Sequence, residues 1–435
     1  MTGEPDPRPV TPARGPLDAT VMLPGSKSIT NRALVCAALA DGTSTLDGAL
    51  FADDTEAMME CLAQLGVGVV ADREVNTVTV VGGSGRLPAA RGVLDARLSG
   101  TTARFLAPVL ALGEGPYLLD GAGGLRARPM QEMFDALRAR GAIVVEEGTA
   151  GHLPCTIERG PGGGDREVHL GAEVSSQFAS GLLLSAPCQP EGLELRLDGP
   201  VVSQPYLDLT VAVMAAFGAE VSRPDDRTYV VEASGYRAVR YQIEPDASAA
   251  SYAFAAAAIV GGRVRVEGLT LASLQGDVRF VDVLAAMGAE VEGGSDFIEV
   301  RGAGTLRGRT ADFSQFSDTA QTLAVVAVFA DAPTEVTGIG FIRKKETDRI
   351  QAVATELRRC GIDATETTDG FRVVPGTPHA AIVQTYGDHR MAMSFALLGL
   401  RVPGIQIADP DCVMKTFPRY WETLEQLRTG TREAR

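Results

Sequence analysis

The chain is poor in several residue types that mark common classes of protein. It has only four histidines, which argues against an all-histidine metal centre. Its six cysteines form no CxxC pair, so we expect reduced thiols rather than a zinc site or a disulfide framework. No apolar run approaches the roughly 18 residues of a membrane span, and the N-terminus lacks the apolar core of a signal peptide. These absences predict a cytoplasmic protein with no membrane partner.

Basic residues are also in short supply. Lys and Arg number 40 against 55 Asp and Glu, giving a formal net charge of −15. Such an acidic chain is a poor candidate for binding nucleic acid, and any anion site must concentrate its cations locally. With 435 residues, the chain is too long for one ordinary core, so two or three domains are expected.

One local concentration of cations lies in the segment 23–32, LPGSKSITNR. Ser26 or Ser28 is typical of a helix N-cap, and an apolar run follows directly. The helix start would carry Lys27, Ser28 and Arg32, and its free N–H groups would suit phosphate or carboxylate. An ordinary capped helix with solvated cations is the alternative. A Walker A loop is excluded because Ser26 separates the glycine from the lysine.

A unit of roughly 70 residues recurs six times. Each copy has an amphipathic helix, a glycine suited to end it in a left-handed conformation, and usually a strand pair. The stop glycines are Gly66, Gly141, Gly218, Gly288, Gly361 and Gly430. Short, nearly all-apolar runs repeat in register and predict buried helices; they begin near Ala33, Phe105, Phe178, Tyr252, Leu323 and Met391. Two element types sharing one period argue against chance spacing.

The repeats predict an α/β (α+β) fold with two domains of three units each. The sixth unit has no hairpin because the chain ends, and we expect residues 10–23 to supply its missing strand. The second domain would then be discontinuous, and two crossings of the chain would act as hinges around a cleft. The predicted parts are a flexible tail at 1–16, a domain at 25–243, a second domain from 17–24 plus 244–435, and hinges near 24 and 244.

Cations recur where helices are expected to begin. They are Lys27, Arg32, Arg104, Arg128, Lys345, Arg349, Arg390 and Lys415. Each one alone is more often solvated or beside a simple cap. Together, in an acidic protein, they predict a binding site for ligands with several negative charges. Asp318 and Glu346 would transfer protons at this site.

Seven motifs, in chain order, resemble the EPSP synthase (3-phosphoshikimate 1-carboxyvinyltransferase) family. They are LPGSKSITNRAL, SGTTARF, SSQF, DASAASY, KETDR, GDHRMAM and KTFPRYW, and they run from Leu23 to Trp421. The resemblance implies a two-domain inverse α/β barrel, each domain having three βαβαββ units around buried helices. This agrees with the sixfold repeat.

The resemblance also implies the reaction. The enolpyruvyl group of phosphoenolpyruvate would pass to the 5-hydroxyl of shikimate 3-phosphate by addition and elimination, releasing phosphate on the way to chorismate and the aromatic amino acids. No metal or organic cofactor is expected. The partners would be these two small molecules, and the family is usually monomeric.

The matched motifs assign site residues as expectations. The shikimate 3-phosphate ligands would be Lys27, Ser28, Arg32, Ser175, Ser176, Gln177, Ser203, Tyr206, Asp318 and Lys345. The phosphoenolpyruvate ligands would be Lys27, Gly100, Arg128, Gln177, Arg349, Arg390 and Lys415. Asp318 resembles the base at the 5-hydroxyl and Glu346 the proton carrier at C3, with His389 assisting. Lys27 is the alternative acid.

The chain departs from the family pattern in places. Leu98 and Phe341 stand where many or some members carry Asn, and Gln204 replaces a frequent Lys. These changes affect fine substrate contacts rather than the reaction. Gly100 matches the small residue that admits glyphosate in sensitive members, so we expect sensitivity.

Three other functions fit the sequence less well. UDP-N-acetylglucosamine enolpyruvyltransferase has the same architecture but typically carries Lys-Asn where Lys27-Ser28 stands here. An RNA 3′-phosphate cyclase is disfavoured by the net charge and by the lack of a visible nucleotide-transfer histidine motif. A non-catalytic anion-binding relic is disfavoured by the retained Asp318 and Glu346.

Overall fold

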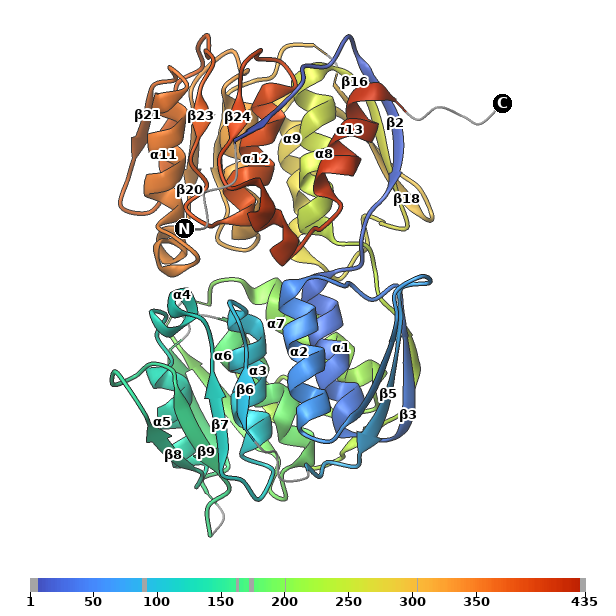
Figure 1. Cartoon of the computed structure of the whole chain (residues 1–435), viewed down its shortest axis with the longest axis vertical. Helices are drawn as coiled ribbons and strands as arrows, with labels where there is room; N and C mark the ends of the chain where they lie inside the picture. The colour runs from blue at the N-terminus through green and yellow to red at the C-terminus, as the bar shows by residue number, and fades with distance from the viewer. Residues whose placement is uncertain are drawn as a thin grey trace. The chain divides into compact units, whose positions relative to one another are not determined.

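The computed structural model describes residues 7–87, 92–161, 164–171, 176–199, 201–302 and 304–430. The chain divides into two compact units, each with its own hydrophobic core (Figure 1). We call Gly25–Glu244 the continuous unit, and the residues up to Pro24 together with those from Pro245 onward the split unit.

The continuous unit contains three sheets and the helices between them. Its helices are α1 (Lys27–Leu39), α2 (Asp53–Gln64), α3 (Gly100–Leu110), α4 (Gly123–Arg126), α5 (Gln131–Ala139), α6 (Ser176–Ser185), η1 (Ala186–Cys188) and α7 (Gln204–Ala216). Its strands are β3 (Ala40–Asp47), β4 (Gly68–Asp72), β5 (Thr77–Gly83), β6 (Val93–Asp95), β7 (Tyr117–Asp120), β8 (Ile143–Glu146), β9 (Cys155–Glu158), β10 (Glu167–Gly171), β11 (Leu193–Asp198), β12 (Val221–Ser222), β13 (Thr228–Val231), β14 (Tyr236–Arg237) and β15 (Arg240–Gln242).

The split unit has the same plan. Its helices are α8 (Ala247–Val260), η2 (Gly276–Arg279), α9 (Phe280–Met287), η3 (Ser317–Thr319), α10 (Ala320–Ala327), η4 (Gly340–Lys344), α11 (Arg349–Arg359), α12 (His389–Gly399), η5 (Pro410–Lys415) and α13 (Tyr420–Thr429). Its strands are β1 (Arg8–Pro9), β2 (Leu17–Met22), β16 (Gly262–Glu267), β17 (Glu290–Gly293), β18 (Phe297–Gly302), β19 (Thr310–Asp312), β20 (Thr334–Thr337), β21 (Ala364–Glu366), β22 (Phe371–Val373), β23 (Ile382–Val383) and β24 (Gln406–Ile407).

Five of the sheets repeat one pairing pattern, as the repeats predict. The first strand is parallel to the second, and the hairpin strands are antiparallel, as in β6-β7-β9-β8 and β10-β11-β13-β12. The sheets β2-β16-β18-β17, β19-β20-β22-β21 and β14-β3-β5-β4 follow the same rule, and β15 also pairs with β3. In Figure 1, β3 and β5 lie on one side of the continuous unit's helices and β7 to β9 on the other.

The expectation for the missing strand of the sixth unit is wrong in detail. β1 (Arg8–Pro9) completes its sheet by pairing antiparallel with β24. The longer β2 instead lies parallel to β16, in the sheet of the fourth unit. Conversely, β15, which leads toward α8, pairs with β3 in the continuous unit. The strands that lead into α1 and α8 are therefore exchanged between the two units.

The predicted flexible tail is also wrong from residue 7 onward. Val10 is buried, and its N–H donates to the Ile405 carbonyl at 3.0 Å. The Ala13 N–H donates to the Leu400 carbonyl at 2.8 Å. This segment is held because its backbone groups and an apolar side chain find partners in the split unit, which its proline-rich composition does not reveal.

The helix ends follow the sequence closely. The six stop glycines all have positive φ, from 81° at Gly430 to 109° at Gly288, where a Cβ would add strain. The predicted apolar runs lie in α1, α3, α6, α8, α10 and α12, whose middle residues are fully buried. Within each unit these buried helices pack against one another, as α3 does against α6 and α10 against α12.

Candidate active site

Helix starts gather around Arg32 in the continuous unit. Its Nη1 donates to the Ser28 carbonyl at 2.9 Å, and its Nε donates to Thr210 Oγ1 at 2.8 Å. Its Nη2 donates to Ser180 Oγ at 3.1 Å and to the Tyr206 carbonyl at 3.2 Å. One guanidinium thus ties together α1, α6 and α7, with partners that range from the second residue of α1 to the middle of α7.

Arg32 gives this end of the unit a buried positive charge. The side chain is 2% exposed, its hydrogen bonds go to neutral oxygens, and the Phe105 ring lies 5.0 Å from its guanidinium carbon. Burial lowers its pKa to about 10, which leaves it charged at neutral pH. A cation whose hydrogen-bond acceptors carry no charge attracts an anionic ligand to the surrounding helix starts.

A second group surrounds Gly100, the first residue of α3. Arg104 Nη1 donates to Gln177 Oε1 at 2.7 Å, and Gln177 Nε2 donates to Thr101 Oγ1 at 3.2 Å. A Cβ at Gly100 would lie 3.2 Å from Arg128 Nη1 and 3.6 Å from Arg104 Nη1. Two guanidinium groups and one amide therefore come within contact distance of a position that carries no side chain.

Lys27 lies at the first position of α1, directly after its N-cap Ser26. Its ammonium is 3.4 Å from Asp54 Oδ2, on the first turn of α2. Ser176 begins α6, and Ser203 precedes α7 in a left-handed conformation with φ 58°. These residues also belong to helix starts of the continuous unit.

Asp318 is the hub of a charge network in the split unit. Its Oδ1 accepts from Arg349 Nη1 at 3.1 Å and from Lys345 Nζ at 3.4 Å. Its Oδ2 accepts from Arg390 Nη2 at 2.6 Å. One carboxylate therefore holds three cations, which come from the starts of α11 and α12 and from the segment before α11.

Arg349 joins the same network to two further carboxylates. Its Nη2 donates to Glu346 Oε2 at 2.8 Å, and its Nε donates to Asp388 Oδ2 at 2.8 Å. Burial lowers the pKa of Arg349, but the attraction of Asp388, Glu346 and Asp318 outweighs burial and raises it above the ordinary value. The guanidinium is fixed on three sides by carboxylates, so its orientation is set before any ligand binds.

The remaining residues extend this network. Lys415 Nζ lies 3.8 Å from Glu346 Oε1. Asp388 caps α12 by accepting from the Arg390 N–H at 2.9 Å, and His389 Nδ1 lies 3.5 Å from its carboxylate. His389 is 1% exposed and lies beside Asp388. Burial lowers the pKa of Lys345, against the opposing attraction of Asp318.

The comparisons with known proteins agree on one family. The family model for EPSP synthase (3-phosphoshikimate 1-carboxyvinyltransferase) matches residues 12–424. The 3-phosphoshikimate 1-carboxyvinyltransferase of Nostoc punctiforme is 46% identical over 417 residues, covering 94% of this chain and 97% of the relative. That of Thiobacillus denitrificans is 43% identical, covering 96% and 98%. The chain belongs to the EPSP synthase family.

Solved structures support the fold of this family. The EPSP synthase of Acinetobacter baumannii matches with a TM-score of 0.82 and 26% identity, covering 96% of this chain and 97% of that one. The enolpyruvyl transferase NikO of Streptomyces tendae matches with a TM-score of 0.75 at 19% identity, which shows the fold alone. The predicted two-domain inverse α/β fold is confirmed, as is enolpyruvyl transfer in the shikimate pathway; the UDP-N-acetylglucosamine alternative is not favoured.

The structure places the predicted site residues of this family member in two groups, one in each unit. Arg32, Ser28 and Tyr206 form one contact set of the continuous unit, and Gly100, Arg128 and Gln177 form another. The predicted residues of the split unit fall into the network around Asp318 and Arg349. Ser175 lies outside the described residues.

Sequence reasoning missed the partners of these residues. Asp54 faces Lys27, Arg104 holds the Gln177 amide, and Asp388 bonds Arg349. Arg104 is among the cations predicted at helix starts, but neither Arg104 nor Asp388 is among the predicted site residues. The paired acids that open α2 were the only sequence signal for Asp54.

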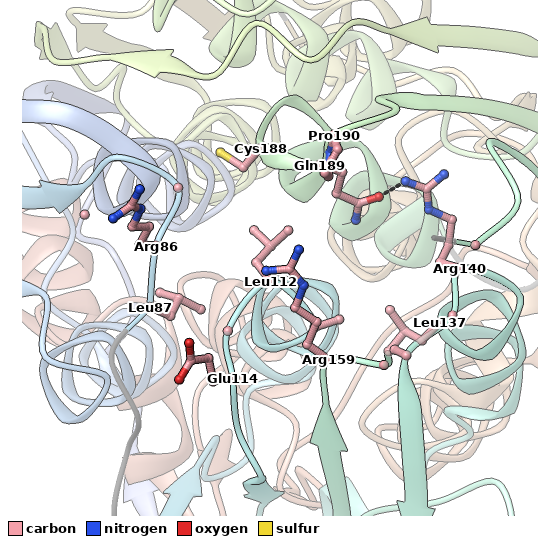
Figure 2. A pocket seen from close by; sticks show the side chains of 18 of the residues that line it. Arg86, Leu87, Leu112, Glu114, Leu137, Arg140, Arg159, Cys188, Gln189 and Pro190 are labelled. Atoms are coloured by element: carbon pink, nitrogen blue, oxygen red, sulfur yellow. Dashed lines mark hydrogen bonds between the residues drawn. The ribbon is translucent and has the colours of Figure 1, made fainter. Parts of the chain in front are cut away.

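A cavity of about 1450 Å³ in the continuous unit is not this site. None of the described residues that line it is a predicted site residue, and it opens beside the C-terminal ends of α3 and α6. Figure 2 shows Arg86, Arg140, Arg159 and Glu114 in its wall. Arginines beside helix C-termini are expected, because they offset the negative end of the helix dipole. Arg140, for example, is the C-cap residue of α5.

No helix within the described ranges is both long and apolar enough to cross a membrane. In the same residues, no cluster of three or more His, Cys, Asp or Glu side chains is arranged to hold a metal ion.

Proposed function

We propose that the two groups of site residues together carry out the reaction of the family, the transfer of the enolpyruvyl group of phosphoenolpyruvate to the 5-hydroxyl of shikimate 3-phosphate. The observation that carries this assignment is the network in which Asp318 pairs with Lys345, Arg349 and Arg390. Such a network holds cations for anionic substrates and a carboxylate for proton transfer in one place.

The cations would exchange partners when substrate binds. Four cations, Lys345, Arg349, Arg390 and Lys415, are held by the carboxylates Asp318, Glu346 and Asp388. The phosphate and carboxylate of phosphoenolpyruvate would compete for the same guanidinium and ammonium groups. Asp318 and Glu346 would thereby give up part of their pairing and gain basicity at the moment when substrate is present.

Shikimate 3-phosphate would bind mainly at the helix starts of the continuous unit. We assign its contacts there to Lys27, Ser28, Arg32, Ser175, Ser176, Gln177, Ser203 and Tyr206. Helix N-termini offer free N–H groups, and Arg32 adds a buried positive charge. In the split unit we assign Asp318 and Lys345 to the same substrate, and in the continuous unit Gly100, Arg128 and Gln177 to phosphoenolpyruvate.

The chemistry would proceed in two balanced steps. Asp318 takes the proton of the 5-hydroxyl while that oxygen adds to C2 of phosphoenolpyruvate, and C3 receives a proton from Glu346. In the second step C3 returns a proton to Glu346, the C2–O bond to phosphate breaks, and phosphate leaves with the proton that Asp318 took from the 5-hydroxyl. Lys27 is the alternative donor to C3. His389 acts through Asp388, which it contacts, and we place it as a positioning residue.

We further propose a cytoplasmic monomer with no nucleic-acid or membrane partner. The six cysteines are free thiols, as is typical of a reducing compartment, and the net charge of −15 disfavours nucleic acid. Size-exclusion chromatography with light scattering would check the oligomeric state, since a monomer has a mass of 45.6 kDa.

Phosphate release is the direct test of the reaction. Purified protein is incubated with phosphoenolpyruvate plus either shikimate 3-phosphate or UDP-N-acetylglucosamine. Release with shikimate 3-phosphate alone is expected. Phosphate release only with the nucleotide sugar would show that the assigned acceptor, shikimate 3-phosphate, is wrong. No phosphate release in either reaction, from folded protein, would favour an anion-binding relic.

A further inference from the structure

The buried carboxylate of Glu356 is not among the assigned site residues, yet it holds the chain that leads into α12. Glu356 is 0% exposed on α11. It accepts from the Gln384 N–H at 2.9 Å and from the Tyr386 hydroxyl at 2.7 Å. Arg359 Nε adds a third bond at 2.8 Å. Two of its three donors therefore belong to the segment between β23 and α12.

That segment has an unusual backbone. Tyr386 has φ 56° and Gly387 has φ 68°, so two successive residues are left-handed, and the first of them is not glycine. The turn is closed by the Asp388 N–H, which donates to the Thr385 carbonyl at 2.9 Å. A tyrosine in this conformation is strained and persists only where surrounding contacts hold it. Its bond to Glu356 is such a contact.

The other end of the segment is held by the same helix. Arg349 Nε bonds Asp388 Oδ2 at 2.8 Å, and Glu356 stands seven residues, or about two helical turns, further along α11. Residues at this spacing share one helix face. Side chains of α11 therefore form hydrogen bonds with both ends of the segment 384–388. Asp388 in turn caps α12, the helix that carries Arg390.

We propose that Glu356 is a positioning residue for enolpyruvyl transfer. It fixes the segment 384–388 so that Asp388 caps α12 and Arg390 keeps its bond to Asp318. The inference rests on the proposed roles of Asp318 and Arg390. A displacement of about 1 Å at a reacting group lowers a rate by as much as a hundredfold, so the loss of this anchor has a measurable effect.

The test compares Glu356→Ala with a matched control, Glu299→Ala. Glu299 is also 0% exposed in the split unit, and it holds three arginines, Arg263, Arg265 and Arg301, on β16 and β18. Within the described part of the chain, these partners do not include any assigned site residue. Both variants should lose thermal stability. Only Glu356→Ala should lower kcat/KM for phosphoenolpyruvate, by about 10- to 100-fold.

Two readouts separate positioning from general damage. The dissociation constant of shikimate 3-phosphate, assigned mainly to the continuous unit, should change less than threefold in Glu356→Ala. Glu356→Gln keeps one acceptor oxygen and should recover part of the lost activity. The proposal would be overturned by equal losses of kcat/KM in the Glu299 and Glu356 variants. It would also be overturned if Glu356→Ala weakened the binding of both substrates equally.

Tyr386→Phe keeps the test decisive if Glu356→Ala does not fold. It removes one bond to Glu356 from a side chain that is 45% exposed. We expect a three- to tenfold loss of kcat/KM for phosphoenolpyruvate with unchanged binding of shikimate 3-phosphate, and no loss would refute the role. Failure of the proposed function would show separately, as a lack of phosphate release by the unmodified protein.

Discussion

Replacing Asp318 with Asn should separate catalysis from binding. The change keeps the shape of the side chain and removes the negative charge that three cations share. If Asp318 is the base at the 5-hydroxyl, kcat should fall by about 10²- to 10⁴-fold, the usual contribution of a general base.

Binding of phosphoenolpyruvate should tighten rather than weaken. A unit charge about 4 Å from a cation interacts by about 4 kcal/mol at an effective dielectric constant of about 20. Asp318 competes with the substrate for Arg349 and Arg390. Because side chains and water rearrange, we expect about 1–2 kcal/mol of this interaction energy to appear as a gain in binding free energy. Removing the competition should lower the dissociation constant roughly 5- to 30-fold.

The assay measures kcat by phosphate release and the phosphoenolpyruvate dissociation constant by equilibrium dialysis. Asp331→Asn is the control, because that carboxylate accepts from the Gly308 N–H at 3.0 Å in an exposed loop of the same unit. A kcat within tenfold of the unmodified enzyme would remove Asp318 as the base. Weaker binding of phosphoenolpyruvate in a variant with an unchanged melting temperature would mean that Asp318 chiefly holds the cations in place.

Four further predictions test other parts of the site and fold. Glu346→Gln should reduce deuterium exchange into C3 of phosphoenolpyruvate in heavy water by at least a hundredfold; retained exchange would point to the alternative acid. Because burial lowers the pKa of Lys345, this side chain should lose its charge at a lower pH than an ordinary lysine, and KM for shikimate 3-phosphate should rise with pH. Lys345→Arg should remove this rise. A rise in both proteins would mean that a group other than Lys345 causes the pH dependence. Gly399→Ala would place a Cβ 2.5 Å from that of Val10, so urea denaturation should show a loss of about 1–3 kcal/mol in the free energy of unfolding. An unchanged midpoint would mean that the segment around Val10 shifts without cost. Millimolar glyphosate should inhibit the enzyme, and Gly100→Ala should relieve the inhibition; full activity in glyphosate would refute the inferred sensitivity.

The local structure of the helices could be predicted because its causes are local. A glycine at a stop position adopts a positive φ without a Cβ clash, and Gly66 and Gly288 end their helices in this way. Ser26, Asp246 and Asp388 cap helices through bonds to N–H groups three or fewer residues away. The ordered motifs likewise named the site residues, whose individual roles remain predictions.

The contacts of the site residues could not be predicted in the same way. Arg32 bonds Ser180 and Thr210, which lie 148 and 178 positions further along the chain. Its hydrogen-bonding capacity is known from its chemistry, but any hydroxyl or carbonyl in the protein would satisfy it. Only the packing of α1 against α6 and α7 selects these partners.

The sequence by itself determined where helices begin and end, how often the unit repeats, and which cations stand at helix starts, because these depend on residues within a turn or two of each other. The tertiary structure decided which strand completes which sheet. An alternating strand such as β2 fits any open edge of suitable length, and its pairing with β16, about 245 residues away, depends on where the chain crosses between units. The tertiary structure also decided that α11 forms hydrogen bonds with the loop before α12. A buried carboxylate such as Glu356 accepts hydrogen bonds from whichever donors the fold brings to it.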